Sequence, residues 1–279
     1  MYRYSATQWI FGGEDIEDSL KRLSKYGYDG VELAGEPYSL DMERIKSLLD
    51  QYNLTCTSLC GIYTPERDLS SSNQTIREKA VQYVKDCVDM AQELGASHLI
   101  VVPTFVEKVS PQTTREEEWA NAVKSVREAG EYALSKDINL AVEALNRYES
   151  YLVNNLDLAI KFVEEVKIEC VKMMADVFHM SIEERSMSDA IKKIARYLIH
   201  VHIADNTREA AGLGQVNFLE VIDTLREVNY KGPITMEFLP PISNPYLVSD
   251  YGGKSELYDF YTEQSIKHIK SLVRMNQTI

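Results

Sequence analysis

The stretch Asn139–Ser150 reads NLAVEALNRYES and changes character halfway along. Its first half, NLAVEA, is typical of a buried strand, whereas NRYES is polar and loop-like. Glu143 therefore falls near the carboxyl end of a strand that belongs in the core. An ionised carboxylate is unfavourable there unless it is paired or bound to a cation. A second carboxylate, Glu149, follows six residues later from the loop.

The same alternation of an apolar run and a polar loop recurs along the whole chain. Short apolar and β-branched runs predict eight strands: Arg3–Thr7, Gly30–Leu33, Leu54–Leu59, Leu99–Val102, Asn139–Ala144, Val171–Asp176, Leu198–Ala204 and Pro233–Phe238. Apolar residues at helical spacing predict a helix after each strand: Glu14–Tyr26, Ser39–Tyr52, Gln74–Leu94, Arg115–Ser135, Leu156–Val166, Ser188–Tyr197, Phe218–Val228 and Glu256–Met275.

Eight strands that alternate with eight helices predict a parallel sheet, because each helix carries the chain back to the start of the next strand. Right-handed crossovers over eight units favour closure into an α/β (β/α)8 barrel, the TIM-barrel fold. A doubly wound open sheet is the alternative, but WIFGGED (9–15) lacks the third glycine of a GxGxxG turn. No linker or change of composition divides the 279 residues, so we expect a single domain over 1–279.

Composition narrows the possible partners. The formal net charge of −13, from 30 Lys and Arg against 43 Asp and Glu, repels phosphate backbones and argues against nucleic acid. The four cysteines show no zinc spacing, and we expect reduced thiols in the core. The opening MYRYSATQWI lacks a secretion-signal pattern, and no apolar run approaches membrane length. We therefore expect a cytoplasmic protein without a membrane partner.

Four consecutive predicted strands each end in a side chain that can bind a metal ion. The carboxyl ends of TIM-barrel strands meet at one rim, which is where active sites lie in this fold. Three carboxylates and one imidazole, without a thiolate, suit manganese, magnesium or cobalt better than structural zinc, and we expect manganese first. The sequence thus predicts a divalent metal site with the ligands Glu143, Asp176, His202 and Glu237.

Three further polar side chains follow these strand ends by three to six residues: Glu149, His179 and Arg208. Their positions place them beside the predicted metal site, in the loops at the same rim. Arg208 is suited to bind a substrate hydroxyl or a developing oxyanion, because its guanidinium is a permanent cation with several donors.

The other histidines carry less information. His200 faces the same side of its strand as His202, one pleat lower, and is either a partner of the site or a filler of the barrel interior. His98 and His268 have no clustered partner in the sequence, and we expect structural roles for both.

In order and spacing, four segments resemble the D-tagatose 3-epimerase group, also called D-psicose or allulose 3-epimerases. This group lies within the xylose isomerase-like TIM-barrel superfamily of sugar phosphate isomerases and epimerases. The segments are EALNRYES (143–150), DVFHMSIEE (176–184), HVHIADNTREAAGLGQVNF (200–218) and ITMEF (234–238). GIYTPERDLSSSNQTIREKAVQYV (61–84) also resembles the loop and helix after the third strand of that group. The resemblance runs from the second predicted strand onward.

The resemblance implies roles for particular residues. The four predicted ligands match the metal ligands of the group, and Glu143 and Glu237 also match its proton-transfer pair. Glu149, His179 and Arg208 match its substrate contacts. The implied protein is a homo-oligomer, a dimer or a tetramer, that epimerises a free ketohexose or related keto sugar. The first four βα loops depart from the group, so the identity of the sugar stays open.

The chemistry also has a physical basis. Inverting a carbon beside a ketone requires removing a proton from one face and returning one to the other, which two carboxylates can do when a divalent metal stabilises the enediolate. The same ligands serve other metal–enolate reactions of the superfamily: isomerisation of keto-inositols or hydroxypyruvate, dehydration, 3-keto-glycoside cleavage and epimerisation of phosphorylated ketoses. Phosphorylated substrates are disfavoured, since the last two βα loops carry few cations besides Arg208.

Two other classes of protein fit less well. Endonuclease IV resembles this architecture, but it needs a multi-zinc cluster with histidines from the early strands. VELAGEP (31–37) and SLCGIY (58–63) contain no histidine, and the net charge is wrong for DNA. A non-catalytic binding protein has no need of a complete acid–acid–histidine–acid set beside an arginine.

Overall fold

Eight parallel strands form a closed barrel in the computed structural model, which describes residues 2–241 and 255–275. Neighbours in the sequence are neighbours in the sheet, and the last strand pairs with the first. The strands are β1 (Arg3–Thr7), β2 (Gly30–Gly35), β3 (Thr55–Gly61), β4 (His98–Val101), β5 (Asn139–Val142), β6 (Val171–Asp176), β7 (Leu198–Ile203) and β8 (Pro233–Met236). The predicted (β/α)8 barrel is confirmed, and the open doubly wound sheet is excluded.

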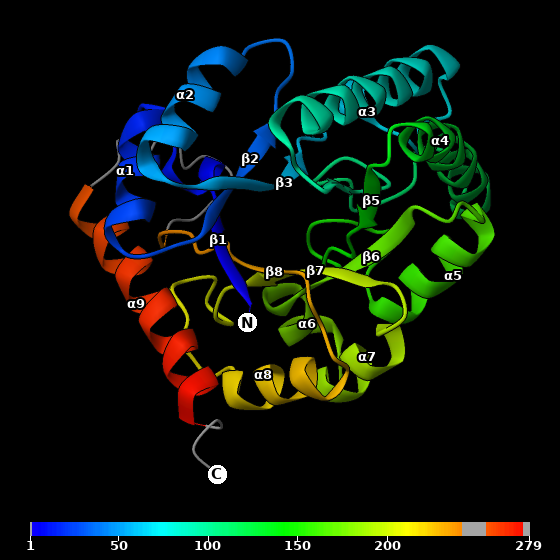
Figure 1. Cartoon of the computed structure of the whole chain (residues 1–279). Coiled ribbons are helices and arrows are strands. Elements are labelled where there is room, and N and C mark those ends of the chain that lie inside the picture. The colour runs from blue at the N-terminus through cyan, green and yellow to red at the C-terminus, as the bar shows by residue number, and fades with distance from the viewer. Residues whose placement is uncertain (1, 242–254, 276–279) are drawn as a thin grey trace.

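Helices surround the barrel as a ring (Figure 1). They are α1 (Ile16–Lys25), α2 (Met42–Tyr52), α3 (Gln74–Leu94), α4 (Arg115–Ser135), α5 (Leu156–Val166), α6 (Val177–Glu183), α7 (Met187–Ile194), α8 (Phe218–Glu227) and α9 (Ser255–Met275). Two short 3-10 helices, η1 (Gln8–Phe11) and η2 (Pro65–Arg67), follow β1 and β3. No helix in the described ranges is both long and apolar enough to cross a bilayer.

The sequence missed one helix. Residues 177–183 were expected to be a loop, but they form α6, which lies between the strands and α7 in Figure 1. The helix starts because the Asp176 carboxylate accepts hydrogen bonds from the backbone N–H groups of Phe178 at 2.7 Å and His179 at 3.2 Å. Such a cap satisfies amide donors that have no partner within the helix. α6 therefore carries His179 on an ordered element next to the barrel rim.

Two of the predicted strands end two residues earlier than expected. β5 stops at Val142 and β8 at Met236, so Glu143 and Glu237 each stand one residue beyond a strand. Their backbone N–H groups still donate to carbonyls of the adjacent strands, to Val101 and Ile203 respectively, at 3.0 Å each. The barrel ladder thus fixes the positions of both glutamates.

The strands alternate between two environments. Their outward side chains pack with the helices in a large apolar core that includes Leu33, Leu59, Phe162 and Ile191. Inside the barrel, a small apolar cluster consists of Cys60, Ile100, Ala141 and Met174. Buried polar side chains share the strands of the barrel: Ser5, Glu32, His98, His200, His202 and Thr235. All four cysteines are free and buried, as expected.

A buried ion cluster ties together the loops after β3, β4 and β5. The Lys108 ammonium lies 2.7 Å from an Asp68 carboxylate oxygen, 2.6 Å from a Glu118 oxygen and 2.9 Å from the Ser70 hydroxyl. The Tyr151 hydroxyl donates to the same Glu118 carboxylate. All five residues are buried. This lysine cluster joins three consecutive βα loops and the first turns of α4.

Replacing Lys108 with Met should destabilise the fold strongly, because the variant leaves two buried carboxylates without their cation. We expect the free energy of unfolding to fall by about 3–5 kcal/mol. Lys136→Met is the matched control, because its ion pair with Asp89 is partly exposed, and we expect little or no loss of stability there. Denaturant unfolding of both variants measures the difference, and equal losses would contradict the structural role of the lysine cluster.

Candidate active site and metal centre

The four predicted ligands converge at the carboxyl-terminal rim of the barrel. One ligand atom from each lies within 4.8 Å of the ligand atoms of the others, and all four side chains are buried. His202 comes from β7 and Asp176 ends β6, while Glu143 and Glu237 follow β5 and β8. The four residues lie far apart in the sequence, and the closed barrel brings their side chains together.

The arrangement fits a divalent cation. The His202 Nδ1 atom lies 3.1 Å from a Glu237 carboxylate oxygen and 3.6 Å from Asp176 Oδ2. Both Nδ1 of His202 and Oδ2 of Asp176 are buried and make no hydrogen bond within the described residues. Asp176 uses its other oxygen to cap α6. Unsatisfied buried acceptors that face one another are costly unless a cation binds between them.

The pKa values respond to this crowding of charge. Burial, and then the Glu237 carboxylate, raise the pKa of Glu143 well above its usual value. Burial alone would lower the pKa of His202, but the carboxylates of Glu237 and Glu32 raise it well above its usual value. Burial opposes ionisation of Asp176 as well, yet His179 and His202 hold its pKa below the usual range. The cluster therefore attracts positive charge.

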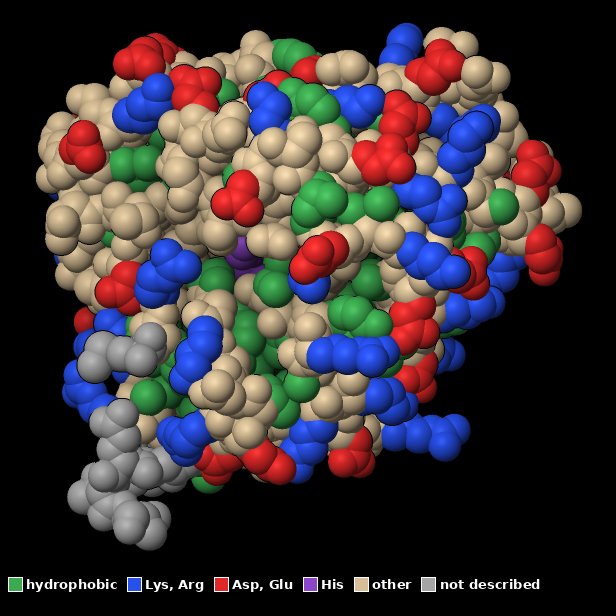
Figure 2. All heavy atoms as spheres, turned by 45° about the vertical axis from the view of Figure 1, so that its right-hand side comes forward, with side chains coloured by type: hydrophobic (Ala, Val, Ile, Leu, Met, Phe, Trp, Pro, Cys, Tyr) green, Lys and Arg blue, Asp and Glu red, His purple; other side chains and the backbone are tan. Residues whose placement is uncertain are grey.

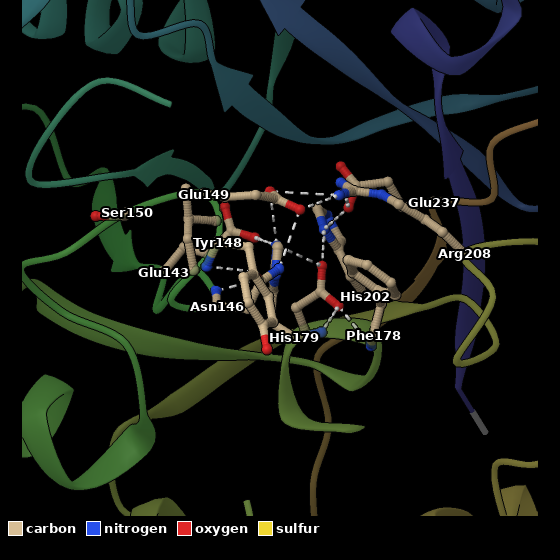
Figure 3. A network of polar contacts seen from close by, with 12 residues as sticks. Glu143, Asn146, Tyr148, Glu149, Ser150, Phe178, His179, His202, Arg208 and Glu237 are labelled. Atoms are coloured by element: carbon tan, nitrogen blue, oxygen red, sulfur yellow. Dashed lines mark hydrogen bonds and ion pairs between the residues drawn. The ribbon is translucent and has the colours of Figure 1, made fainter. Parts of the chain in front are cut away.

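The three predicted substrate contacts lie beside the cluster (Figure 3). Arg208 Nη1 donates to a Glu149 oxygen at 3.1 Å, and its Nη2 lies 3.6 Å from a Glu237 oxygen. Arg208 has a positive φ of 63°, which is unusual for a residue with a side chain. Such conformations persist where the surrounding structure enforces them, often at functional sites.

His179 points one ring nitrogen at the acids. Its Nδ1 accepts from the Asn146 backbone N–H at 3.2 Å and lies 2.8 Å from the Asn146 amide nitrogen. The proton of the neutral ring is thus assigned to Nε2, which lies 3.8 Å from Glu143 and 3.9 Å from Glu149. Figure 3 shows the ring between the two glutamates. Sequence reasoning missed Asn146, which orients this histidine.

A cavity of about 350 Å³ opens onto these residues. Its polar wall includes Glu143, His179, Arg208 and Glu237. The remaining lining comes mainly from the loops after β1, β3, β4 and β5: Trp9, Gly61, Ile62, Tyr63, Thr64, Pro65, Val106, Glu107 and Leu145. On the face drawn in Figure 2, acidic and basic side chains are interspersed, and histidine appears only as a small patch between other atoms. The cavity suits a small polyol with one reactive end.

Sequence reasoning missed a second polar group below the cluster. Glu32 is fully buried on β2, and one of its oxygens lies 2.9 Å from His202 Nε2. His200 Nε2 lies 3.1 Å from the other oxygen, so His200 is a partner of the site. The expectation that His98 has no clustered partner was wrong, because its Nε2 lies 2.8 Å from His200 Nδ1. The one available signal was a glutamate inside the apolar run GVELAG (30–35).

The chain belongs to the xylose isomerase-like TIM barrel family, whose model matches residues 20–249. Several proteins that it resembles in sequence are sugar 3-epimerases. It is 31% identical over 226 residues to an L-ribulose 3-epimerase of Methylomonas sp., covering 80% of this chain and 79% of that protein. It is 30% identical over 243 residues to a D-psicose 3-epimerase of Ruminiclostridium cellulolyticum, covering 85% and 81% respectively.

A solved structure agrees with this relationship. The D-allulose 3-epimerase of Methylomonas sp., in complex with D-allulose, superimposes with a TM-score of 0.87 at 27% identity. The match covers 97% of this chain and 96% of that one. The resemblance stated from the sequence is thus confirmed at the level of family and fold.

Replacing Asp176 with Asn should weaken divalent-cation binding while leaving α6 intact, because an amide oxygen can still cap the helix but carries no charge. We expect the Kd for Mn²⁺ to rise at least about tenfold. Asp41→Asn is the matched control, since Asp41 caps α2 through the Arg44 N–H. Isothermal titration of metal-free protein measures both, and an unchanged affinity in Asp176→Asn would contradict the assignment.

Proposed function

We propose that this chain is a metal-dependent ketose 3-epimerase acting on a free ketohexose or a related keto sugar. The observation that carries the proposal is the pairing of two buried glutamates, from opposite ends of the β5–β8 half of the barrel, within one metal-binding cluster that opens onto a sugar-sized cavity. The homology to ketose 3-epimerases at about 30% identity supports it.

The two glutamates exchange protons with the substrate. One, as a carboxylate, takes the proton from C3, and the electron pair of the broken C–H bond moves to form an enediolate with the C2 carbonyl. The other, as a carboxylic acid, returns a proton to the opposite face of C3. A bound divalent cation supplies Lewis-acid stabilisation of the negative charge on oxygen.

The neighbouring residues orient the sugar. Arg208 carries the one Lys or Arg side chain among the described residues that line the cavity, and it is held between Glu149 and Glu237. A guanidinium and the Nε2–H of His179 are both groups that can donate hydrogen bonds to sugar hydroxyls. Glu149 accepts from Arg208 and from the Asn146 amide at 3.0 Å, which fixes its carboxylate for a hydroxyl donor.

The finer features of the proposal rest on chemistry and resemblance. Manganese is the proposed cation, with cobalt or magnesium as substitutes, because oxygen ligands dominate the cluster. We also propose one domain over residues 1–279, a cytoplasmic location, and a homo-oligomer of two or four subunits. Sedimentation of the purified protein tests the last of these.

Glu237→Gln should abolish epimerisation but still allow the remaining glutamate to exchange protons on its own face. We expect turnover to fall at least about 100-fold on every ketose tested. Deuterium exchange at C3 in D2O should persist for one epimer and be lost for the other. Because Glu237 is also a proposed ligand, bound Mn²⁺ must be measured in the same samples.

Two controls accompany this variant. Glu183→Gln changes a buried carboxylate that pairs with Arg147 outside the cluster, and it should keep near wild-type turnover. Chelation should remove activity from the wild type, and Mn²⁺ should restore it. Near wild-type turnover in Glu237→Gln with Mn²⁺ bound, or full activity after thorough chelation, would refute the proposal.

Free ketoses should be better substrates than their phosphates. A bound divalent cation would offset Glu143 and Glu237, and the described lining then carries Glu107 against one arginine, so it offers a phosphate dianion no excess of positive charge. We expect kcat/KM for a ketose phosphate to be at least about tenfold lower. A panel of free ketoses, ketose phosphates, keto-inositols and 3-keto glycosides, assayed with Mn²⁺, measures this preference. A preference for any other class would assign a different reaction to the same residues.

A further inference from the structure

We propose that Glu32 positions His202 for metal binding by fixing the orientation and the tautomer of its ring. Glu32 would touch neither the cation nor the sugar and would act through His202 alone. The inference rests on the proposed function, because it takes the cluster at the barrel rim to be a metal site.

The geometry of His202 separates its two ring nitrogens. Nδ1 faces the acids of the cluster, Glu237 at 3.1 Å and Asp176 at 3.6 Å. Nε2 points the other way and lies 2.9 Å from Glu32 Oε1. A cation at Nδ1 requires a free lone pair there, so the single ring proton must sit on Nε2. Glu32 is placed to accept that proton in a hydrogen bond, which selects the tautomer that binds metal.

Glu32 is itself held rigidly. Its side chain is fully buried, and the Ser58 hydroxyl donates to its second oxygen at 2.7 Å. His200 Nε2 lies 3.1 Å from that same oxygen. The ion pairs and hydrogen bonds described for its side chain involve two histidines and a serine, and neither lysine nor arginine. An acid buried in this way stabilises a fold poorly compared with an apolar side chain of similar size, so a role toward His202 accounts for it better.

The strand pairing is irregular next to Glu32 and the two histidines that contact it. The strand pairings β2–β3 and β6–β7 each show a register shift, whereas the other six described pairings show none. The first shift falls between Val31 and Glu32, and the second brings Met174 opposite His200. Bulges of this kind re-aim side chains and recur beside active sites. One shift thus falls at Glu32 and the other beside His200, two members of the same buried group.

A pair of histidines and a serine extend this group down the barrel. His200 Nδ1 lies 2.8 Å from His98 Nε2, and His98 Nδ1 lies 2.9 Å from the Ser97 hydroxyl. If His202 donates to Glu32, then each neighbour has one consistent assignment: His200 carries its proton on Nε2, and His98 donates from its own Nε2 to His200 Nδ1. These contacts hold His200 beside the Glu32 carboxylate.

The test compares Mn²⁺ binding to metal-free wild type, Glu32→Gln and Ser58→Ala by isothermal titration. Glu32→Gln keeps the size of the side chain but removes its charge, and we expect roughly 10–100-fold weaker binding. Ser58→Ala removes one hydrogen bond to the same carboxylate but keeps its charge and its contact with His202, so we expect a smaller loss of Mn²⁺ affinity than in Glu32→Gln. Unfolding of the metal-free proteins reports whether each variant is folded.

The outcomes separate this inference from the proposed function. If folded Glu32→Gln binds Mn²⁺ as tightly as the wild type, Glu32 does not position His202, although the epimerase proposal stands. If the wild type itself binds no Mn²⁺, the proposed function fails and the positioning role fails with it. Binding that is weaker in Glu32→Gln than in Ser58→Ala supports the inference, and an equal loss in the two variants contradicts it.

A spectroscopic measurement covers the case in which Glu32→Gln does not fold. Wild-type protein with ¹⁵N-labelled histidine, saturated with diamagnetic Mg²⁺, has five histidines to resolve. We expect His202 to keep a slowly exchanging proton on Nε2 and none on Nδ1. A His202 ring with its proton on Nδ1, or with no proton on Nε2, would overturn the inference. A purely structural glutamate would not dictate either result.

Discussion

Three carboxylates and an imidazole, buried within 4.8 Å of one another, set the constraint on which the rest of this molecule depends. Like charges at that separation repel strongly in a low dielectric, and burial adds a desolvation penalty. Cationic and polar neighbours reduce this repulsion. Arg208 and His179 lie beside the acids, and the backbone N–H groups at the start of α6 donate hydrogen bonds to one oxygen of Asp176. The remaining imbalance is what a divalent cation neutralises.

The predicted metal ligands stand on regular strands or next to them, whereas the residues proposed to contact the sugar stand on less regular backbone. The ladder of parallel strands fixes Glu143, Asp176, His202 and Glu237 in space, since each stands on a strand or one residue beyond it. The side chains proposed to meet the sugar stand on less regular segments: Glu149 in a loop, His179 on a seven-residue helix, and Arg208 at a left-handed position. The strands of the barrel thus carry the metal ligands, and the loops, which tolerate change more easily, carry the residues proposed to recognise the sugar.

The sequence predicted the fold and the rim well, because both depend on local patterns. Strand and helix periodicity locates each element, and the strand-end rule then gathers Glu143, Asp176, His202 and Glu237 without further information. The sequence did not predict contacts between strands on different sides of the barrel. Glu32 meets His202 although 170 residues separate them, and His98 meets His200 across 102. No local pattern encodes such pairs, and the two register shifts that aim them are invisible in strand periodicity. α6 was missed because a seven-residue segment is too short to show a helical repeat.

The lysine cluster has a consequence for how substrate preference can change. Lys108, Asp68, Glu118 and Tyr151 bind three consecutive βα loops to one another beneath the residues that line the cavity. The backbone of Glu107 also donates to the Glu149 carbonyl at 2.7 Å. These loops therefore behave as one block, and an insertion or exchange in any one of them displaces the others. Altered sugar selectivity should be easiest to obtain by point substitution on this block, or by transplanting all three loops together from a related barrel.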